Sequence, residues 1–230
     1  MTGRKGIDDM KKIIAIALIV TCAFALFSCG SDGTIDNVNK MFKSVAPTKV
    51  VTETTEVFGE VTLTSKSTLL SGKVDGKAAA TYEFSNMELR SIEDGSGDFE
   101  ELPWVVISGL YEYHEDKGVR IDGGKWQDDM YNFAPTAGSN ALNLKKKLVN
   151  NLEEDAVTKT VKFTVAADNT ETVFGEKIKC DVLVTITHDG SAITSVVLNY
   201  TVPASDKDHP DIVTTVKVLY SYDAEKIVIK

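Results

Sequence analysis

One acidic segment has the alternating carboxylates that calcium-binding loops use. Within residues 93–101, Asp94, Ser96 and Asp98 stand at alternate positions. A calcium loop needs glycine at its sharp turn and a bidentate Glu at a fixed spacing. Phe99 occupies the glycine position, and the spacing to a closing Glu is wrong. We therefore interpret this segment as a solvated loop, and expect no metal site in the chain.

The three histidines, His114, His188 and His209, fall at predicted strand ends or turns. The sequence contains no G-x-S-x-G, S-x-x-K or H-E-x-x-H motif, which would place a nucleophile or zinc ligands at a usable spacing. The acidic stretch 206–211 around Pro210 is interpreted as solvated, like the first acidic loop. We predict no catalytic residue and no cofactor, so the chain is not expected to be an enzyme.

Two tryptophans, Trp104 and Trp126, could stack on a sugar ring, although packing is the commoner role of an isolated tryptophan in a hairpin. An enzyme or sugar-binding protein that uses the acidic loop and these tryptophans remains one alternative. Calcium-dependent stabilisation, or turnover lost on changing Asp94 and Asp98, would favour it.

The cysteine with the clearest chemistry is Cys29. It follows an apolar run, Ile13–Phe27, that is preceded by Lys11 and Lys12. This layout is typical of a signal peptide, and the run is shorter than the ~20 apolar residues that span a bilayer. The tetrapeptide 26–29, Leu-Phe-Ser-Cys, resembles the bacterial lipobox. We expect cleavage before Cys29 and acylation of its thiol by fatty acids such as palmitate.

This interpretation divides the chain into residues 1–28 as a lipoprotein signal peptide, residues 29–34 as the lipidated cysteine and a short tether, and residues 35–230 as a single domain. The domain is then exported and anchored to the bacterial cell membrane. Residues 1–29 carry a net charge of +2, so the remainder carries −11, against −9 for the whole chain. Such a surface repels nucleic acid and anionic headgroups, so acylation has to supply the membrane attachment.

Two helices are expected in the mature chain. In the first, Thr34 or Asp36 is the N-cap, one face carries Ile35, Val38, Met41 and Phe42, and Pro47 ends the helix. The second is predicted over 140–156, capped by Ser139 or Asn140. Its apolar positions are spaced at i, i+4, namely Leu144, Leu148, Leu152 and Ala156.

The rest of the chain has the two-residue alternation of half-buried strands. Asp75-Gly76 predicts a hairpin between a strand with Val61 and Leu63 and one with Ala80, Tyr82 and Phe84. Residues 104–114 and 118–122 predict a second hairpin, and a third is expected at Asp189-Gly190. Roughly eight strands joined by hairpins predict an antiparallel sheet.

The sheet is too large for the helices to cover. Eight strands of ~25 to 30 Å at ~4.8 Å spacing present an apolar face on the order of 1000 Å², and two helices ~10 Å wide cover about half of it. We therefore predict an α+β fold: a curved antiparallel β half-barrel with two amphipathic helices over its concave face.

This order of elements resembles the LolA/LppX-type bacterial lipoprotein family. The likeness rests on a helix directly after Cys29, on the segment VRIDGGKW (119–126), and on ETVFGEKIKCDV (171–182), which is similar to a strand entry of that family. The resemblance implies binding or carriage of a lipid or another apolar ligand, without chemistry.

We therefore expect a half-barrel cavity between the sheet and the helix 140–156, containing an acyl chain or a similar molecule. Alternation on the last strands places Cys180 on the same face as the apolar residues, with its thiol toward the interior. The alternative is a packed core, which would make the domain a structural or interaction module of the envelope. The expected cavity residues are Leu144, Leu148, Leu152, Phe163, Cys180, Val182, Val184, Ile186, Leu198, Tyr200 and Val218.

Overall fold

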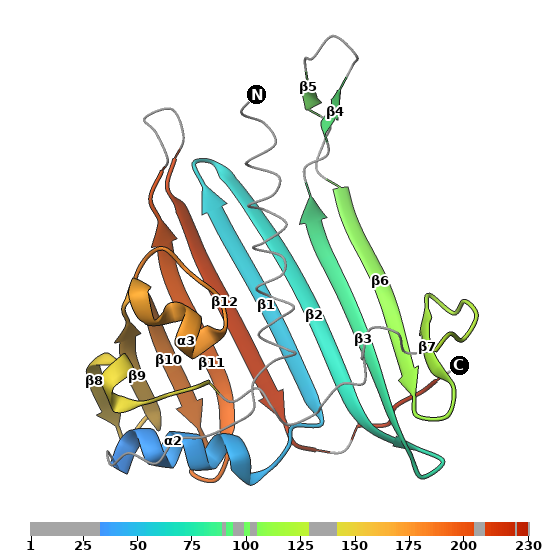
Figure 1. Ribbon diagram of the computed structural model, residues 1–230, viewed down its shortest axis with the longest axis horizontal. Coiled ribbons are helices and arrows are strands. Elements are labelled where there is room, and N and C mark those ends of the chain that lie inside the picture. The colour runs from blue at the N-terminus through green and yellow to red at the C-terminus, as the bar shows by residue number, and fades with distance from the viewer. Residues whose placement is uncertain are drawn as a thin grey trace.

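The fold is dominated by one curved, unclosed antiparallel sheet of ten strands with two short helices (Figure 1). The computed structural model describes residues 33–88, 91–93, 99–101, 105–128, 142–204, 210–223 and 225–229. The signal segment, Cys29, Trp104 and His209 lie outside these residues. The strand order is β7-β6-β3-β2-β1-β12-β11-β10-β9-β8. No described helix is long and apolar enough to cross a membrane.

The bounds of the elements follow the chain. The helices are α2 (Gly33–Ser44) and α3 (Thr170–Phe174), with 3₁₀ turns at Lys146–Leu148 and Ala167–Asn169. The strands are β1 (Lys49–Phe58), β2 (Val61–Val74), β3 (Lys77–Glu88), β6 (Val105–His114), β7 (Gly118–Ile121), β8 (Asn150–Asp155), β9 (Thr160–Val165), β10 (Val182–His188), β11 (Ile193–Val202) and β12 (Ile212–Ser221). Strands β4 (Ser91–Glu93) and β5 (Phe99–Glu101) pair only with each other.

The first helix and the hairpins are as predicted. Ile35, Val38 and Phe42 on α2 are buried. Asp75 and Gly76 have φ values of 52° and 80°, which are the left-handed conformations that a tight hairpin turn requires.

The predicted helix over 140–156 is wrong. Its described part is an extended segment, one 3₁₀ turn and the edge strand β8, which pairs with β9. Asp155 Oδ1 accepts the N–H groups of Val157 (2.8 Å) and Thr158 (3.1 Å), and this local turn starts the β8–β9 hairpin. Pairing with β9 outweighed the helical spacing of the leucines, because intrinsic propensity is a weak preference.

The second helix lies instead at α3, where the resemblance had placed a strand entry. Gly175, with a φ of 77°, ends the helix in the left-handed conformation. The Thr170 side chain is fully buried, and its hydroxyl lies 2.8 Å from the Ala167 carbonyl and accepts the Ile178 N–H at 2.9 Å. These contacts join α3 to the approach to β10.

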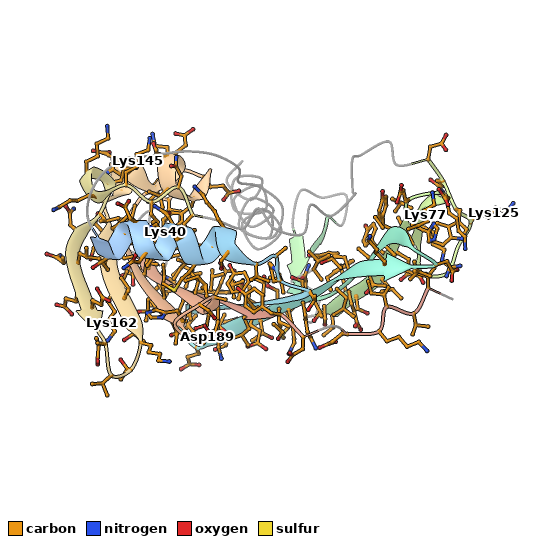
Figure 2. All side chains as sticks on the ribbon, turned by 90° about the horizontal axis from the view of Figure 1, so that it is seen from below. Lys40, Lys77, Lys125, Lys145, Lys162 and Asp189 are labelled. Carbon is orange, nitrogen blue, oxygen red and sulfur yellow. The ribbon has the colours of Figure 1, made fainter. Side chains whose placement is uncertain are left out.

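Both described helices lie over the β9–β12 end of the sheet (Figures 1 and 2). We call the face on which α2 packs the inner face. The half of that face formed by β8–β12 is the covered half, and the half formed by β2, β3, β6 and β7 is the open half. In Figure 2, α2 and Lys40 lie at one end of the sheet, and the β2–β3 turn beside Lys77 lies at the other.

Candidate binding surfaces

The residues predicted to line a cavity belong to one hydrophobic cluster or pack against it, and this cluster extends from the covered half to Leu69, Ala80 and Tyr82 on β2 and β3. Phe163, Val182, Val184, Ile186 and Val218 each expose 0% of their surface. The others are buried too, apart from Leu152 and Cys180, which are half-buried and pack against the cluster. The structure thus brings the predicted cavity residues together in one place.

The leucines expected on a helical lid do cover this core, but from an irregular segment. Leu144 and Leu148 are buried beside Leu142 and Val149, which the prediction did not include. Asn39 of α2 donates its side-chain N–H to the Leu144 carbonyl at 3.0 Å, which ties the segment to the helix.

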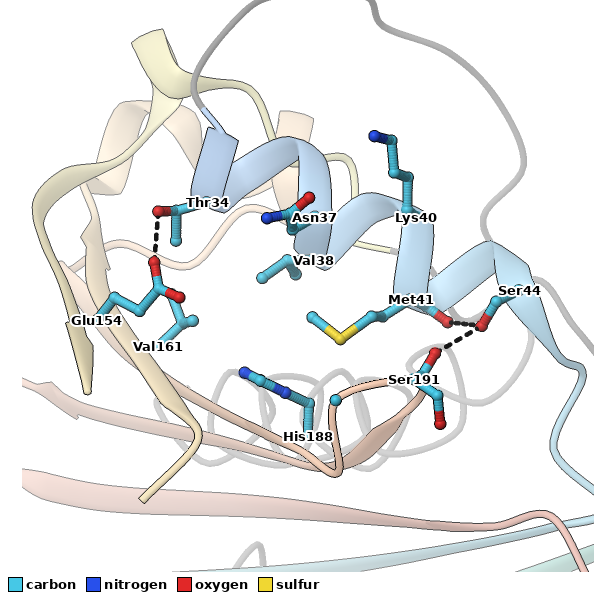
Figure 3. Close-up of a pocket in the computed structure, with 11 residues that line it drawn as sticks. Thr34, Asn37, Val38, Lys40, Met41, Ser44, Glu154, Val161, His188 and Ser191 are labelled. Atoms are coloured by element: carbon cyan, nitrogen blue, oxygen red, sulfur yellow. Dashed lines mark hydrogen bonds between the residues drawn. The ribbon is translucent and has the colours of Figure 1, made fainter. Parts of the chain in front are cut away.

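A half-open pocket of about 420 Å³ lies between α2, the β8–β9 edge and the β10–β11 turn (Figure 3). Its apolar wall consists of Val38, Met41 and Val161. Its polar wall consists of Thr34, Asn37, Lys40, Ser44, Glu154, His188 and Ser191.

Several polar groups of this pocket already bind one another. Thr34 Oγ1 donates to Glu154 Oε2 at 2.6 Å, and Ser44 Oγ donates to the Ser191 carbonyl at 2.9 Å. These bonds fix α2 to β8 and to the β10–β11 turn. The mixed lining of the pocket suits a small polar molecule better than an acyl chain.

The open half of the inner face carries a row of aromatic side chains. Strand register gives one continuous line across the sheet, from Tyr220 on β12 through Val50, Leu69, Tyr82 and Tyr111 to Ile121 on β7. Tyr220 also meets Phe42 of α2, with ring centroids 6.3 Å apart, so this whole line lies on the face that α2 covers at its other end.

The rings of Tyr82, Phe84 and Tyr111 contact one another, with centroid separations of 5.9 to 6.3 Å. Phe84 and Tyr111 are only half-buried, and Ile121 at the end of the row is 50% exposed. We call Tyr82, Phe84, Tyr111, Tyr113 and Ile121 the aromatic patch. It is an apolar surface that neither described helix covers.

Gly109 makes room for this patch. A Cβ at this position would lie 2.8 Å from the Phe84 ring, closer than atoms in contact can approach. The Phe84 ring therefore lies across the β6 backbone. Alternation in the sequence had placed Phe84 on the same face of its strand as Ala80 and Tyr82, but had not identified the patch.

Between the core and the patch, β1 and β2 carry polar side chains on the inner face. Thr52 and Thr54 are 1% and 6% exposed and pair in register with Ser67 and Ser65. Glu56 is 9% exposed, and burial raises its pKa to about 7. We call Thr52, Thr54, Glu56, Ser65 and Ser67 the polar strip.

Three more titratable side chains, those of Tyr200, Glu176 and Cys180, lie toward the same end of the inner face as Glu56. Burial raises the pKa of the Tyr200 hydroxyl, and the Glu56 carboxylate adds to that rise. Burial also raises the pKa values of Glu176 and of the Cys180 thiol. Cys180 lies before the start of β10, is half-buried and packs against the hydrophobic cluster.

The remaining candidates for chemistry have structural roles or lie outside the described residues. His114 is 5% exposed, and its Nδ1 accepts the Asp116 N–H at 3.2 Å. His188 lines the pocket at α2. The calcium-like positions 94–98 and the acidic positions 206 and 208 are outside the described residues. Within the described ranges, no three His, Cys, Asp or Glu side chains are arranged to hold a metal ion.

Trp126 packs against cations of its own chain. The Arg120 guanidinium lies 4.7 Å from its ring centroid, and Lys117 Nζ lies 5.5 Å away. Arg120 in turn forms a bidentate ion pair with buried Glu112, at 2.6 and 2.9 Å. The ring therefore packs against the β6–β7 hairpin, as expected for a tryptophan in such a position.

Comparison with known proteins identifies no family. No protein-family model matches the chain, and no curated protein matches it. Among solved structures, a DUF1329 family protein from Desulfovibrio piger aligns with 83% of this chain and 93% of its own, at 10% identity and a TM-score of 0.27.

Two structures of MucB in complex with MucA, one of them described as from Pseudomonas aeruginosa, each align with 81% of this chain and 93% of their own, at 10% identity and a TM-score of 0.15. TM-scores this low establish neither a common fold nor a common function. The resemblance to LolA/LppX-type lipoproteins therefore stays a prediction.

Proposed function

We propose that this chain is a lipid-anchored extracytoplasmic protein that binds an apolar or amphipathic molecule on the open half of its inner face. The observation that carries the proposal is the aromatic patch, which continues the hydrophobic core along one strand register beyond the area that the described helices cover. The packed residues of the covered half stabilise the fold, and the patch receives the ligand.

The energetics of such a site are adequate. Burial of a CH₂ group contributes about 0.8 kcal/mol, so burying six or seven methylenes against the patch contributes about 5 kcal/mol. Before any cost of association is subtracted, about 5 kcal/mol corresponds to a Kd of about 0.2 mM, so the patch alone is adequate only for weak, millimolar binding. A carrier has to release its ligand, and an open surface allows that.

Binding is tested with the chain from Gly30 onward, which contains every described element. Equilibrium titration with dodecanol, below its solubility limit, should show saturable binding. Tyr111→Ala and Gly109→Ala should each weaken it, the first by removing a ring and the second by displacing Phe84. Lys162→Ala, on the exposed side of β9, is the matched control.

The second candidate function is an envelope interaction module, in which the aromatic patch is the contact surface for a protein partner. This candidate is supported by the hydrophobic cluster that the predicted cavity residues form or pack against. Saturable binding of dodecanol that Tyr111→Ala weakens supports the first function, and the absence of such binding supports the second.

Anchoring rests on residues 26–29. Cys29→Ala should move the protein from the membrane fraction to the soluble fraction and abolish labelling by a fatty-acid analogue. Unchanged membrane retention of this variant would contradict acylation at Cys29.

A further inference from the structure

Among the described residues, the carboxyl group of Glu56 on the inner face takes part in no ion pair. Glu56 of β1 pairs in register with Thr214 of β12, which pairs with Tyr200 of β11. The three side chains therefore form one row across adjacent strands, on the face that α2 covers. This row lies at the end of the hydrophobic core, and Glu56 is the residue that it shares with the polar strip.

The hydrogen-bonding capacity of this region is not used within the described part of the chain. There, Glu56 Oε1 and the hydroxyls of Thr52 and Thr54 have no hydrogen-bond partner, although all three residues are more than nine-tenths buried. A buried polar atom without a partner costs about 1 to 3 kcal/mol, and a charged one costs more. A ligand that supplied the missing bonds would remove this cost.

A cation that donates hydrogen bonds would satisfy both the charge and the unpaired oxygen of Glu56. None of the ion pairs between described residues involves Glu56, whereas Glu53 on the opposite face of β1 pairs with Lys66 at 2.8 Å. The net charge of −11 outside residues 1–29 also attracts cations and repels anions. The neighbouring hydroxyls of Thr54 and Tyr200 can accept further N–H groups.

We propose that Glu56, with the hydroxyls of Thr54 and Tyr200, binds the ammonium group of an amphipathic amine whose apolar chain lies on the aromatic patch. This rests on the proposed function, and adds the chemical class of the ligand. Phe84 pairs in register with Ser67 of β2, which pairs with Thr52 of β1. Phe84 therefore lies two strands across from β1 and four residues along the sheet from Glu56. At ~3.4 Å per residue and ~4.8 Å per strand, that separation is about 17 Å, comparable to an extended chain of about a dozen carbons.

The test compares three amphiphiles that differ only in their head group. Dodecylamine, dodecanol and dodecanoate are titrated into the chain from Gly30 onward at pH 8, the two ionic amphiphiles below their micellar concentrations and the alcohol below its solubility limit. The amine should bind at least tenfold more tightly than the alcohol, and the carboxylate least tightly. Glu56→Gln should reduce amine affinity to that of the alcohol. Glu53→Gln, on the opposite face of the same strand, should leave the order unchanged.

A second variant guards against misfolding of the first. Thr54→Val removes an unpartnered hydroxyl without leaving a new one, so it should fold normally and still weaken amine binding several-fold. Equal affinity of the three amphiphiles, with no effect of either variant, would overturn the ammonium site and leave the aromatic patch standing. Failure of all three to bind would overturn both.

Discussion

Phe163 and Phe84 point from the same face of one sheet into different surroundings. Phe163 lies on β9, is 0% exposed and packs within the core beneath the helices. Phe84 lies on β3, is half-buried and has Tyr82 and Tyr111 as ring neighbours. Similar alternation of apolar residues therefore produces a rigid core where helices pack, and an accessible apolar surface where the described helices do not reach.

Truncating each phenylalanine measures this difference most directly. Phe163→Ala should lower the free energy of unfolding by about 3 to 5 kcal/mol, because it opens a cavity in a packed core. Phe84→Ala should lower it by only about 1 to 2 kcal/mol, because neighbouring rings and solvent can fill the space. Urea unfolding of both variants checks the prediction. Equal losses would show that the open half is part of the same rigid core.

The polar strip between the halves predicts a pH dependence. The pKa of Glu56 is about 7 in the folded protein and 4.5 in an ordinary environment. Between these pH values the folded protein retains a proton that the unfolded chain has lost. The contribution to stability is therefore fully present below pH 4.5 and is lost as pH rises through 7, a change of about 3 kcal/mol.

Glu56→Gln should remove this decline, since an amide does not titrate. Glu53→Gln, whose parent carboxyl has its pKa lowered by Lys66, should leave the decline in place. Urea unfolding between pH 4.5 and 8 gives the free energy of unfolding of each variant as a function of pH. If the wild-type protein and Glu56→Gln show the same change in stability between pH 5 and pH 8, the Glu56 carboxyl is not desolvated.

The smallest effect concerns Cys180, at the edge of the covered half. Because burial raises its pKa, little thiolate forms near neutral pH, and the group should react with a thiol reagent more slowly in the folded protein than in urea. The labelling rate followed by mass spectrometry tests this. Equal rates in the two conditions would place the thiol in solvent and contradict the packing at the start of β10.

The sequence predicted well where the signal was local. Asp75-Gly76 marks a turn by its backbone requirements, and the alternation around Phe163 and Val184 marks a buried face. The prediction from sequence failed where contacts between residues far apart in the chain decided the structure. Leu144, Leu148 and Leu152 have helical spacing, but the neighbouring residues form the edge strand of the sheet, and α3 depends on contacts of Thr170 with residues farther along the chain. The aromatic patch was missed because no local pattern shows which half of a sheet the helices will cover.

The location of a bound ligand tests the central claim most directly. A dodecanol analogue with a diazirine at the end of its chain can be bound to the protein, photolysed and mapped by peptide mass spectrometry. We predict crosslinks to β3 and β6, at Tyr82, Phe84 or Tyr111, and their loss in excess dodecanol. Crosslinks confined to Phe163, Val184 or Leu198 would instead place the ligand inside the covered half and contradict the account.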